Sequence, residues 1–437
     1  MRLKRGGLLA NHDFLQLWAS ESVSQVGAQV TVVALPLLAA LSLDANAAEM
    51  GLLTAAGTAP PLLLGLVAGV WVDRLRRRPI MVATDLGRAA VLLLIPILWW
   101  LGLLRMELLY LITFVAGVQT LFFDVAWVTF LPSVVRRDQL VEGNSKLQAT
   151  ASGAQVAGPG LAGLLVGLAG APVAVLVDAV SYLLSAFFIL RVRTPEPRPE
   201  RAADAHVLRE IREGLGVVFR NPLLRAIAAS GATVSLFGFM FLAVYVLFMT
   251  EELGFSATSV GLVFSLGGLG AVIGSMLAEP LKRRIGIGPA IIFGRIGFGL
   301  GGLLVPLAVL APSFMVPLVL GAEFLQWLMY LIATINEVSL RQSITPHRLL
   351  GRVNATMRFL NSGMIPIGAL AGGALGGLIG LRETLFVGVF GMLLTGIWVS
   401  LSPLRTTREE PSLLDEHGEL LDTRTEEPTS LVVDASR

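Results

Sequence analysis

The sequence predicts an all-α membrane protein with twelve transmembrane helices in two pseudo-symmetric six-helix bundles. Three observations support this fold class. Of the 437 residues, 54% are hydrophobic and only 15% are charged, which is too little charge to cover the surface of a soluble domain. Long apolar segments follow one another along the chain, each near the roughly 20 residues that a spanning helix needs. Short motifs of the first half also return in the second half.

The apolar segments predict the individual helices. They cover residues 14–43, 48–72, 79–103, 107–132, 141–168, 171–192, 222–250, 257–280, 287–310, 313–341, 349–380 and 382–403. Most connections are very short, so consecutive helices are expected to be antiparallel neighbours. The first segment is too long for a signal peptide and lacks a small-residue cleavage pattern, which favours a retained helix.

Two longer connections divide the chain. They predict an N-terminal bundle (1–192), a linker (193–221), a C-terminal bundle (222–403) and a tail (404–437). Prolines open the linker and prevent helix formation there. Apolar residues then recur at helical spacing from Val207 to Phe219, which predicts an amphipathic helix on the membrane surface. The acidic tail is poor in large apolar residues and is expected to be disordered.

The basic residues predict the orientation in the membrane. Of the 33 lysines and arginines, only Arg105 and Arg382 fall in the connections opposite the N-terminus, and Arg88, Arg295 and Arg358 fall inside predicted helices. The remainder lie on the side of the N-terminus, which the positive-inside rule assigns to the cytoplasm. We therefore expect a multi-pass protein of the plasma membrane with both termini in the cytoplasm.

The charged connection between the second and third segments is the most distinctive motif. It has the sequence GVWVDRLRRR and contains Gly69, Asp73, Arg74, Arg77 and Arg78. Taken alone, these arginines are explained as positive-inside anchors, which any polytopic protein can have.

Several motifs recur between the halves at a nearly constant offset. The matched positions are DRLRRR (73–78) with EPLKRR (279–284), Gly87-Arg88 with Gly294-Arg295, and Ser133, Leu140 and Asn144 with Ser343, Leu350 and Asn354. Because the matches occur in order and at equivalent places, duplication of a six-helix unit explains them better than chance. Two parallel six-helix repeats place a substrate site near the midplane between the halves.

Over residues 12–403 the chain resembles the major facilitator superfamily of transporters. GVWVDRLRRR resembles the connection between helices two and three of that superfamily. Three short segments of this chain resemble the branch of that superfamily that contains macrolide-efflux and enterobactin-exporter-like proteins. They are Asn11-His12-Asp13-Phe14 with Leu17-Trp18, FFDVAW (122–127) and VDAVSYLLSA (177–186). The resemblance implies proton-coupled efflux of amphiphilic small molecules of the drug, macrolide or siderophore type by alternating access. An importer, a uniporter or a lipid-translocating member of the same superfamily is the alternative.

The resemblance also implies a charge relay at the cytoplasmic gate. Asp124, in the fourth segment, lies near the depth of the arginine loop. Asp124 and Asp73 are therefore expected to hold arginines such as Arg77 when the cytoplasmic side is closed, and direct proton carriage by Asp124 is the alternative. A looser counterpart is expected in the second half, at Glu279, Arg283 and Glu337.

Glu21 is the first candidate for a proton-coupling group. It lies two turns into the first segment, and Gln25 and Gln29 continue the same helical face. A polar stripe on an apolar helix must face the protein interior or a water-filled cavity, because lipid offers no partners. The two glutamines are expected to line the substrate cavity. A buried glutamate that the glutamines satisfy is the alternative to a coupling role.

Glu323 and Arg358 are both expected near mid-depth, in the tenth and eleventh segments. Gln326, Trp327 and Tyr330 share a helical face with Glu323. A buried ion pair between the two charged residues is one interpretation. The alternative is that these side chains line the substrate cavity, with Glu323 as a second coupling candidate, because aromatic, amide and charged groups suit amphiphilic ligands.

Three other intramembrane charges have structural explanations. Asp178 is expected to face neighbouring helices, and Asp85 and Arg88 are three residues apart, which predicts a local pair.

In the fifth segment, small residues and a proline share one face, at Ala154, Gly158, Pro159, Ala162 and Gly163. This composition allows close helix packing and a bend. The face also resembles the antiporter motif of the superfamily, although alanine replaces glycine at 154 and 162, and it favours export.

Other function classes lack support in the sequence. There is no cysteine, the four histidines are scattered, and no phosphate-loop lysine signature is present. We therefore expect no enzymatic activity, no cofactor or metal and no nucleic-acid partner. The expected partners are a small-molecule substrate, protons and the lipid bilayer, and the chain is expected to act as a monomer.

Overall fold

The computed structural model describes residues 8–196 and 207–408. Within these residues the chain is helical and contains no β-strand. Eleven helices of the described part are long and apolar enough to cross a membrane. They correspond to eleven of the twelve predicted segments, which confirms those segments. The predicted disordered tail lies almost entirely outside the described residues.

The helix boundaries follow the predicted segments within a few residues. The long helices are α1 (His12–Ser42), α4 (Arg77–Trp100), α5 (Met106–Val134), α6 (Leu140–Ala169), α7 (Ala171–Arg191), α9 (Pro222–Leu247), α10 (Ala257–Ile285), α11 (Ile287–Leu307), α12 (Met315–Ile344), α13 (His347–Ile379) and α14 (Leu381–Leu401). The shorter helices are α2 (Ala47–Thr58), α3 (Pro60–Arg74) and α8 (Val207–Arg220). Single turns are η1 (Leu8–Ala10), η2 (Arg137–Gln139), η3 (Phe248–Glu252), η4 (Ala308–Leu310), η5 (Pro312–Phe314) and η6 (Pro403–Thr406).

The segment predicted as the second span forms two helices instead of one. The break falls where α2 ends at Thr58 and α3 begins at Pro60. Proline has no backbone N–H, so Pro60 and Pro61 cannot donate hydrogen bonds to the preceding turn. Each piece is shorter than the eleven long helices.

The ends of several helices are fixed by local chemistry. The side chain of Asn11 accepts hydrogen bonds from the backbone at the start of α1, and Asn46 and Glu49 form a reciprocal capping box on α2. Gly170 separates α6 from α7 and Gly380 separates α13 from α14, with φ angles of 88° and 100°. Only glycine adopts such angles readily, so each glycine allows a one-residue turn at an equivalent place in the two halves.

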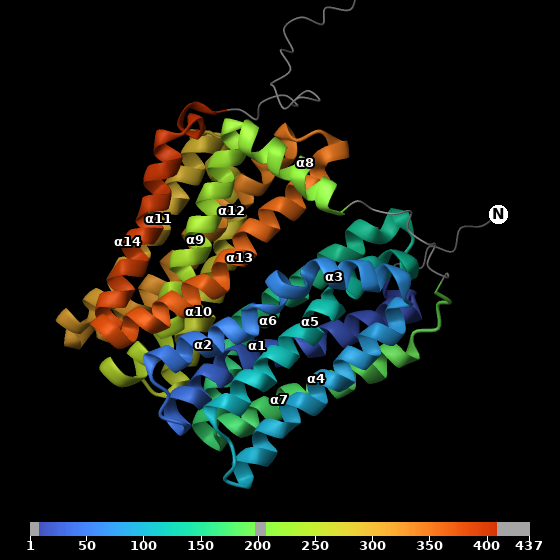
Figure 1. Cartoon of the computed structure of the whole chain (residues 1–437), viewed down its shortest axis with the longest axis horizontal. Coiled ribbons are helices and arrows are strands. Elements are labelled where there is room, and N and C mark those ends of the chain that lie inside the picture. The colour runs from blue at the N-terminus through green and yellow to red at the C-terminus, as the bar shows by residue number, and fades with distance from the viewer. Residues whose placement is uncertain (1–7, 197–206, 409–437) are drawn as a thin grey trace, which may run out of the picture.

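The helices before and after α8 form two sets with the same internal contacts (Figure 1). In the first set α1 packs on α6 and α7, and α4 packs on α5 and α7. In the second set α9 packs on α13 and α14, and α11 packs on α12 and α14. The pairing of helices therefore repeats along with the sequence motifs. Helix α8 lies against α13 and α9.

The two sets meet mainly through α6 against α10 and α2 against α13. The close approaches involve glycines at the ends of these helices that are remote from the chain termini. A Cβ at Gly373 of α13 would lie 2.8 Å from the Cα atom of Gly51 in α2, and one at Gly163 of α6 would lie 2.6 Å from the carbonyl oxygen of Ala257 in α10. These contacts therefore hold the backbones together at one end of the molecule.

The molecule has two ends, called the terminal face and the far face. The terminal face carries the described ends of the chain and α8, and the far face carries the connections from α1 to α2 and from α9 to α10. The two sets diverge toward the terminal face in Figure 1. The glycine contacts between the two sets therefore lie toward the far face, and the helices of the two sets diverge toward the terminal face.

Candidate functional site

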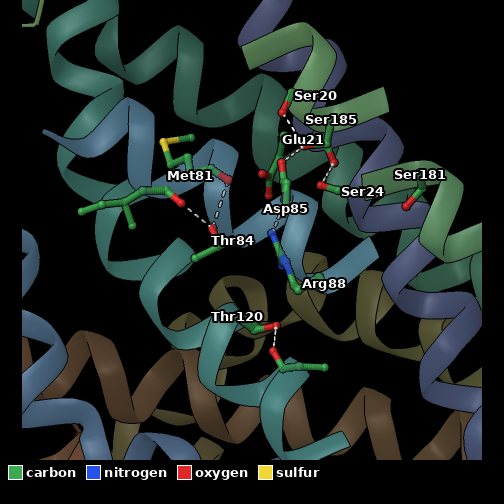
Figure 2. Close-up of polar contacts among 12 residues, drawn as sticks. Ser20, Glu21, Ser24, Met81, Thr84, Asp85, Arg88, Thr120, Ser181 and Ser185 are labelled. Carbon is green, nitrogen blue, oxygen red and sulfur yellow. Dashed lines mark hydrogen bonds and ion pairs between the residues drawn. The ribbon is translucent and has the colours of Figure 1, made fainter. Parts of the chain in front are cut away.

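A polar network occupies the interior of the first helix set. Asp85 and Arg88 of α4 form a buried ion pair, as their spacing predicts. The Asp85 carboxylate also accepts a 2.6 Å hydrogen bond from the Ser185 hydroxyl of α7, and Ser185 shares a 2.8 Å hydrogen bond with Ser20 of α1 (Figure 2). The network therefore joins three helices inside the first set.

The Arg88 guanidinium lies between two aromatic rings. Its central carbon lies 4.3 Å from the ring centroid of Phe123 and 4.1 Å from that of Tyr182. The negative faces of these rings add cation–π attraction to the ion pair with Asp85. Arg88 is thus held by one carboxylate and two aromatic rings, all of which favour its charge.

Asp178 of α7 has a structural environment, as predicted. It is 1% exposed, and it accepts hydrogen bonds from Thr31 of α1 and, at 3.0 Å, from Ser181 of α7. Gly27 leaves the space for this contact, because a Cβ there would collide with Ser181 and Asp178.

Glu21 of α1 is partly buried and accepts a 2.7 Å hydrogen bond from Gln25. Within the described residues no basic side chain lies at ion-pair distance from it, and Asp124 and Arg88 act on it only from farther away. Gln29, one turn beyond Gln25, packs against Gly158 of α6. Of the three polar residues predicted to share a face of α1, Glu21 and Gln25 are therefore hydrogen-bonded to each other, whereas Gln29 packs on α6.

Asp124 of α5 is exposed and lies within electrostatic range of Arg88 and of Arg358 on α13. It does not contact Arg77 in this conformation. The Arg77 backbone N–H and guanidinium instead bind Glu196, at 2.5 and 3.6 Å. The pairing of Asp124 with Arg77 therefore stays a prediction for the conformation closed at the terminal face.

The remaining residues of the arginine loop have different surroundings. Arg78 donates hydrogen bonds to the carbonyl oxygens of Ile189 and Leu190 at 3.2 and 2.5 Å, which satisfies the end of α7. Arg74 is exposed at the end of α3, and a Cβ at Gly69 would meet open space. The side chain of Asp73 lies outside the described part of the structure.

The contact between Glu196 and Arg77 was not predicted from the sequence. Glu196 lies in the proline-rich segment after α7, and its side chain is 6% exposed. An acid beside a proline carries no signal for a distant partner, although its position on the same face as the arginine loop was predictable from the helix count.

A second buried ion pair occupies the interior of the second set. The Arg295 guanidinium of α11 binds the Glu337 carboxylate of α12 through two hydrogen bonds of 2.9 and 2.6 Å, and the Ser230 hydroxyl of α9 donates to the same carboxylate at 2.8 Å. Arg295 also lies 5.5 Å from the ring centroid of Tyr330. Arg88 and Arg295, which match in the sequence repeat, therefore have matching roles.

The predicted grouping of Glu337 with Glu279 and Arg283 is wrong. Glu279 and Arg283 pair with each other at 2.9 Å near the exposed end of α10, where Lys282 lies 2.7 Å from Glu279. Glu337 faces Arg295 inside the second set because these two side chains project toward each other from neighbouring helices.

The predicted ion pair between Glu323 and Arg358 is also wrong. Glu323 is 3% exposed, and its carboxylate accepts hydrogen bonds from the Tyr245 hydroxyl at 3.0 Å and from the Trp327 indole at 2.9 Å. Arg358 is exposed on another side of the bundle. Gln326 is buried against Gly301 and Gly302, and its place in the substrate cavity stays a prediction.

A pocket of 370 Å³ opens in the second set between α9, α11, α12 and α13. Of the predicted cavity residues, it includes Tyr330 and Arg358. Its other polar lining residues, which were not among the predicted cavity residues, are Ser235, Arg295, Thr334, Glu337, Arg341, Asn354 and Asn361. The sequence signal that could have identified these lining residues is the presence of isolated arginines and asparagines inside long apolar helices.

The antiporter-like face of α6 lies at the contact between the two sets. Gly158 packs against Gln29 of α1, while Gly163 and the carbonyl oxygen of Pro159 approach Gly261 of α10. The small residues therefore permit α6 to touch both its own set and the opposite one.

Relatives of known function resemble this chain over most of its length. The multidrug efflux pump Tap of Mycolicibacterium fortuitum is 29% identical over 410 residues, covering 90% of this chain and 95% of Tap. The enterobactin exporter EntS of Escherichia coli O6:K15:H31 is 25% identical over 378 residues, covering 83% of this chain and 85% of EntS.

Solved structures share the fold at low sequence identity. A bacterial homologue of the iron transporter ferroportin in its inward-facing state superposes with a TM-score of 0.70 at 17% identity, over 89% of this chain and 97% of that one. A bacterial homologue of ferroportin in its outward-facing state superposes with a TM-score of 0.55 at 20% identity, over 89% of this chain and 98% of that one.

These findings define the class of the protein. The fold and the relatives are those of a major facilitator transporter for small molecules. The chain is therefore a multi-pass membrane protein that transports molecules, and it is not an enzyme. A family model described as transmembrane secretion effector matches residues 7–433, and the chain belongs to this family.

Proposed function

We propose that the protein is a proton-coupled efflux pump for amphiphilic small molecules that works by alternating access. The observation that carries the proposal is Glu21 of α1, whose hydrogen-bond partner is Gln25 instead of a cation. An acid inside an apolar helix is costly. A carboxylate that loses contact with water when the cavity closes is neutralised most simply by a proton. Glu21 would therefore take up a proton in one conformation and release it in the other.

The direction of transport is inferred from two features. Tap and EntS are named as an efflux pump and an exporter, respectively. The small-residue face of α6, with Gly158, Pro159 and Gly163, resembles the antiporter motif of the superfamily and lies against α10 of the opposite set. Both features favour export over import.

We infer that α2 and α3 together form one interrupted span, which brings the number of spans to twelve in two bundles of six. The bundles would comprise residues 1–192 and 222–403, joined by the linker 193–221. The repeated helix contacts of the two sets support this division.

We also infer that the terminal face is cytoplasmic, because the arginine-rich connections lie there. The structure then corresponds to an inward-facing state of a protein in the plasma membrane. The higher TM-score with the inward-facing ferroportin homologue is consistent with this assignment.

Alternating access requires that the terminal face closes when the far face opens. We propose that Asp124 then binds arginines of the loop, such as Arg77, and so latches the terminal face. Asp124 is well suited to a test, because it is exposed and within the described residues has no ion pair in the present conformation.

Two variants should shift the conformational balance in opposite directions. Asp124→Asn removes the latch and should favour the conformation open at the terminal face. Gly373→Val forces apart the backbones of α13 and α2 at the far face and should favour the opposite conformation. Spin-label distances across each face measure the balance, and the chain has no native cysteine to interfere with labelling.

Gly377→Val is the control for the glycine variant, since a Cβ at Gly377 meets open space. Its distance distributions should match those of the unmodified protein. Unchanged distances in Asp124→Asn would rule out the latch and leave the arginine loop as a topological anchor.

The proposed function is tested by uptake into inside-out membrane vesicles. We expect a panel of macrolides, cationic dyes and catecholate siderophores to include compounds that accumulate when the vesicle interior is acidified. Dissipating the gradient with a protonophore should abolish that accumulation. Transport that is indifferent to the gradient would indicate a uniporter, and movement of fluorescent phospholipids alone would indicate lipid translocation.

A further inference from the structure

We infer that the pocket between α9, α11, α12 and α13 binds the acidic group of the transported molecule, so that the substrates are amphiphilic organic anions. This inference rests on the proposed function, because it treats the pocket as part of the transport cavity. Three observations support it, which concern the charge of the pocket, its unpaired polar atoms and its shape.

The charges that line the pocket do not cancel. Three arginines, Arg295, Arg341 and Arg358, face a single acid, Glu337. The Glu337 carboxylate is already occupied by two hydrogen bonds from Arg295 and one from Ser230. Within the described residues, Arg341 and Arg358 form no ion pair, so the pocket has an excess of positive charge.

Five polar atoms of the pocket are buried and lack a hydrogen-bond partner. They are Arg295 Nη1, Arg341 Nε, Thr334 Oγ1, Asn354 Oδ1 and Asn361 Oδ1. Buried polar atoms in folded proteins are nearly always paired with protein groups or water, so these five atoms are available to hydrogen-bond a ligand that enters the pocket. The two guanidinium nitrogens require acceptors, as a carboxylate or phenolate provides. The amide and hydroxyl groups can in addition bind hydroxyl or N–H groups of the same ligand.

The shape of the pocket suits an organic molecule better than a simple inorganic anion. Its volume of 370 Å³ is within the range of small-molecule sites. Ile227, Val234, Val338 and Met357 supply apolar wall next to the Tyr330 ring. A ligand with an acidic end and an apolar or aromatic body would fill both parts.

The opposite wall of the cavity would orient such a ligand. Arg358 is exposed and lies within electrostatic range of Asp124 on α5 in the first set. Asp124 and Glu21 place negative charge locally on that set, which repels the acidic group and directs it toward the arginines. The two halves thus make unlike contributions to binding, although their folds are alike.

A matched pair of fluorescent probes tests the inference directly. Dansylglycine has a carboxylate where dansylglycinamide has a neutral amide, and the rest of the molecule is the same. Binding is measured by dansyl fluorescence with the full-length protein in nanodiscs of phosphatidylcholine, with empty nanodiscs subtracted. We expect dansylglycine to bind about tenfold more tightly than the amide, as charged hydrogen bonds imply.

The variants Arg341→Gln and Arg358→Gln should each remove most of that preference without weakening the binding of dansylglycinamide. Arg341→Lys and Arg358→Lys should restore part of it, because they keep the charge. Arg105→Gln, which changes an exposed arginine at the far face, should bind both probes like the unmodified protein. Arg358 is also exposed, so its replacement tests the inference even if Arg341→Gln fails to fold.

Equal affinity for the two probes, or a preference that survives both glutamine variants, would overturn the inference. The outcome of the vesicle uptake experiment is independent of the outcome of the probe-binding experiment. Preferential dansylglycine binding without proton-driven uptake would leave the anion pocket intact and refute the proposed coupling. Proton-driven uptake confined to cationic dyes would support the pump and refute the anion pocket.

Discussion

Replacing Glu21 by glutamine is expected to abolish proton-driven accumulation while leaving substrate binding unchanged. Glutamine keeps the size of the side chain and can still bond to Gln25, but it cannot exchange a proton. With one proton per substrate, each pH unit of gradient supports about a tenfold concentration ratio. Inside-out vesicles with the unmodified protein should approach that ratio, and Glu21→Gln vesicles should only equilibrate the substrate.

The control is Glu107→Gln, which neutralises an exposed acid in the first turn of α5 at the far face. It should accumulate substrate as the unmodified protein does. If Glu21→Gln remains coupled, Glu21 is a buried structural glutamate. The same vesicles would then test Asp124 and Glu323, two further acids inside long apolar helices for which the described part of the structure shows no ion pair.

Replacing Arg88 by methionine should destabilise the protein by about 3–5 kcal/mol, which is typical when one partner of a buried ion pair is removed. Asp85 is fully buried, and the variant would leave its carboxylate without a cation. The loss of cation–π contacts with Phe123 and Tyr182 adds to the effect. Thermal unfolding in detergent, followed by fluorescence-detected size-exclusion chromatography, measures the loss.

The double variant Arg88→Met with Asp85→Asn should recover part of this stability, because it buries no unpaired charge. Arg105→Met at the far face should unfold like the unmodified protein. If the single and double variants lose the same stability, the packing of Arg88 between the two rings stabilises the protein and the ion pair with Asp85 does not.

Local features of the sequence predicted the structure well. The Asp85–Arg88 pair was predictable because residues three apart on a helix are neighbours whatever the rest of the fold does. The hydrogen bond from Gln25 to Glu21 follows from the same geometry. Helix ends were also predictable within a few residues, since loss of apolar character and capping groups mark them in the sequence.

Contacts between helices were predicted poorly. Glu323 and Arg358 were placed near the same depth, but depth along a helix does not say which way a side chain points. Glu323 faces Tyr245 of α9, whereas Arg358 lines the pocket between α9, α11, α12 and α13. The Arg295–Glu337 pair was missed for the same reason, although the repeat of Gly87-Arg88 as Gly294-Arg295 hinted that Arg295 has a structural role.

The proline break in the second segment shows a different limit. Pro60 and Pro61 were visible in the sequence, yet the segment was predicted as one span because its apolar character is continuous. Hydropathy measures the free energy of transfer to lipid and does not register the missing N–H group of proline. The loss of that hydrogen-bond donor decides where the helix is interrupted.

The sequence by itself determined that the chain is a bundle of membrane helices whose motifs recur in the second half and whose positive charge lies mainly on one side. Those properties depend on composition, periodicity and order, which are all properties of the linear chain. Only the tertiary structure decided which buried charges are neutralised and which remain available to a ligand. That depends on the rotation of each helix about its axis, and a rotation is set by packing against neighbours that lie far away in the sequence. The difference between Arg295, paired within its bundle, and Arg341 and Arg358, left facing a pocket, is the result.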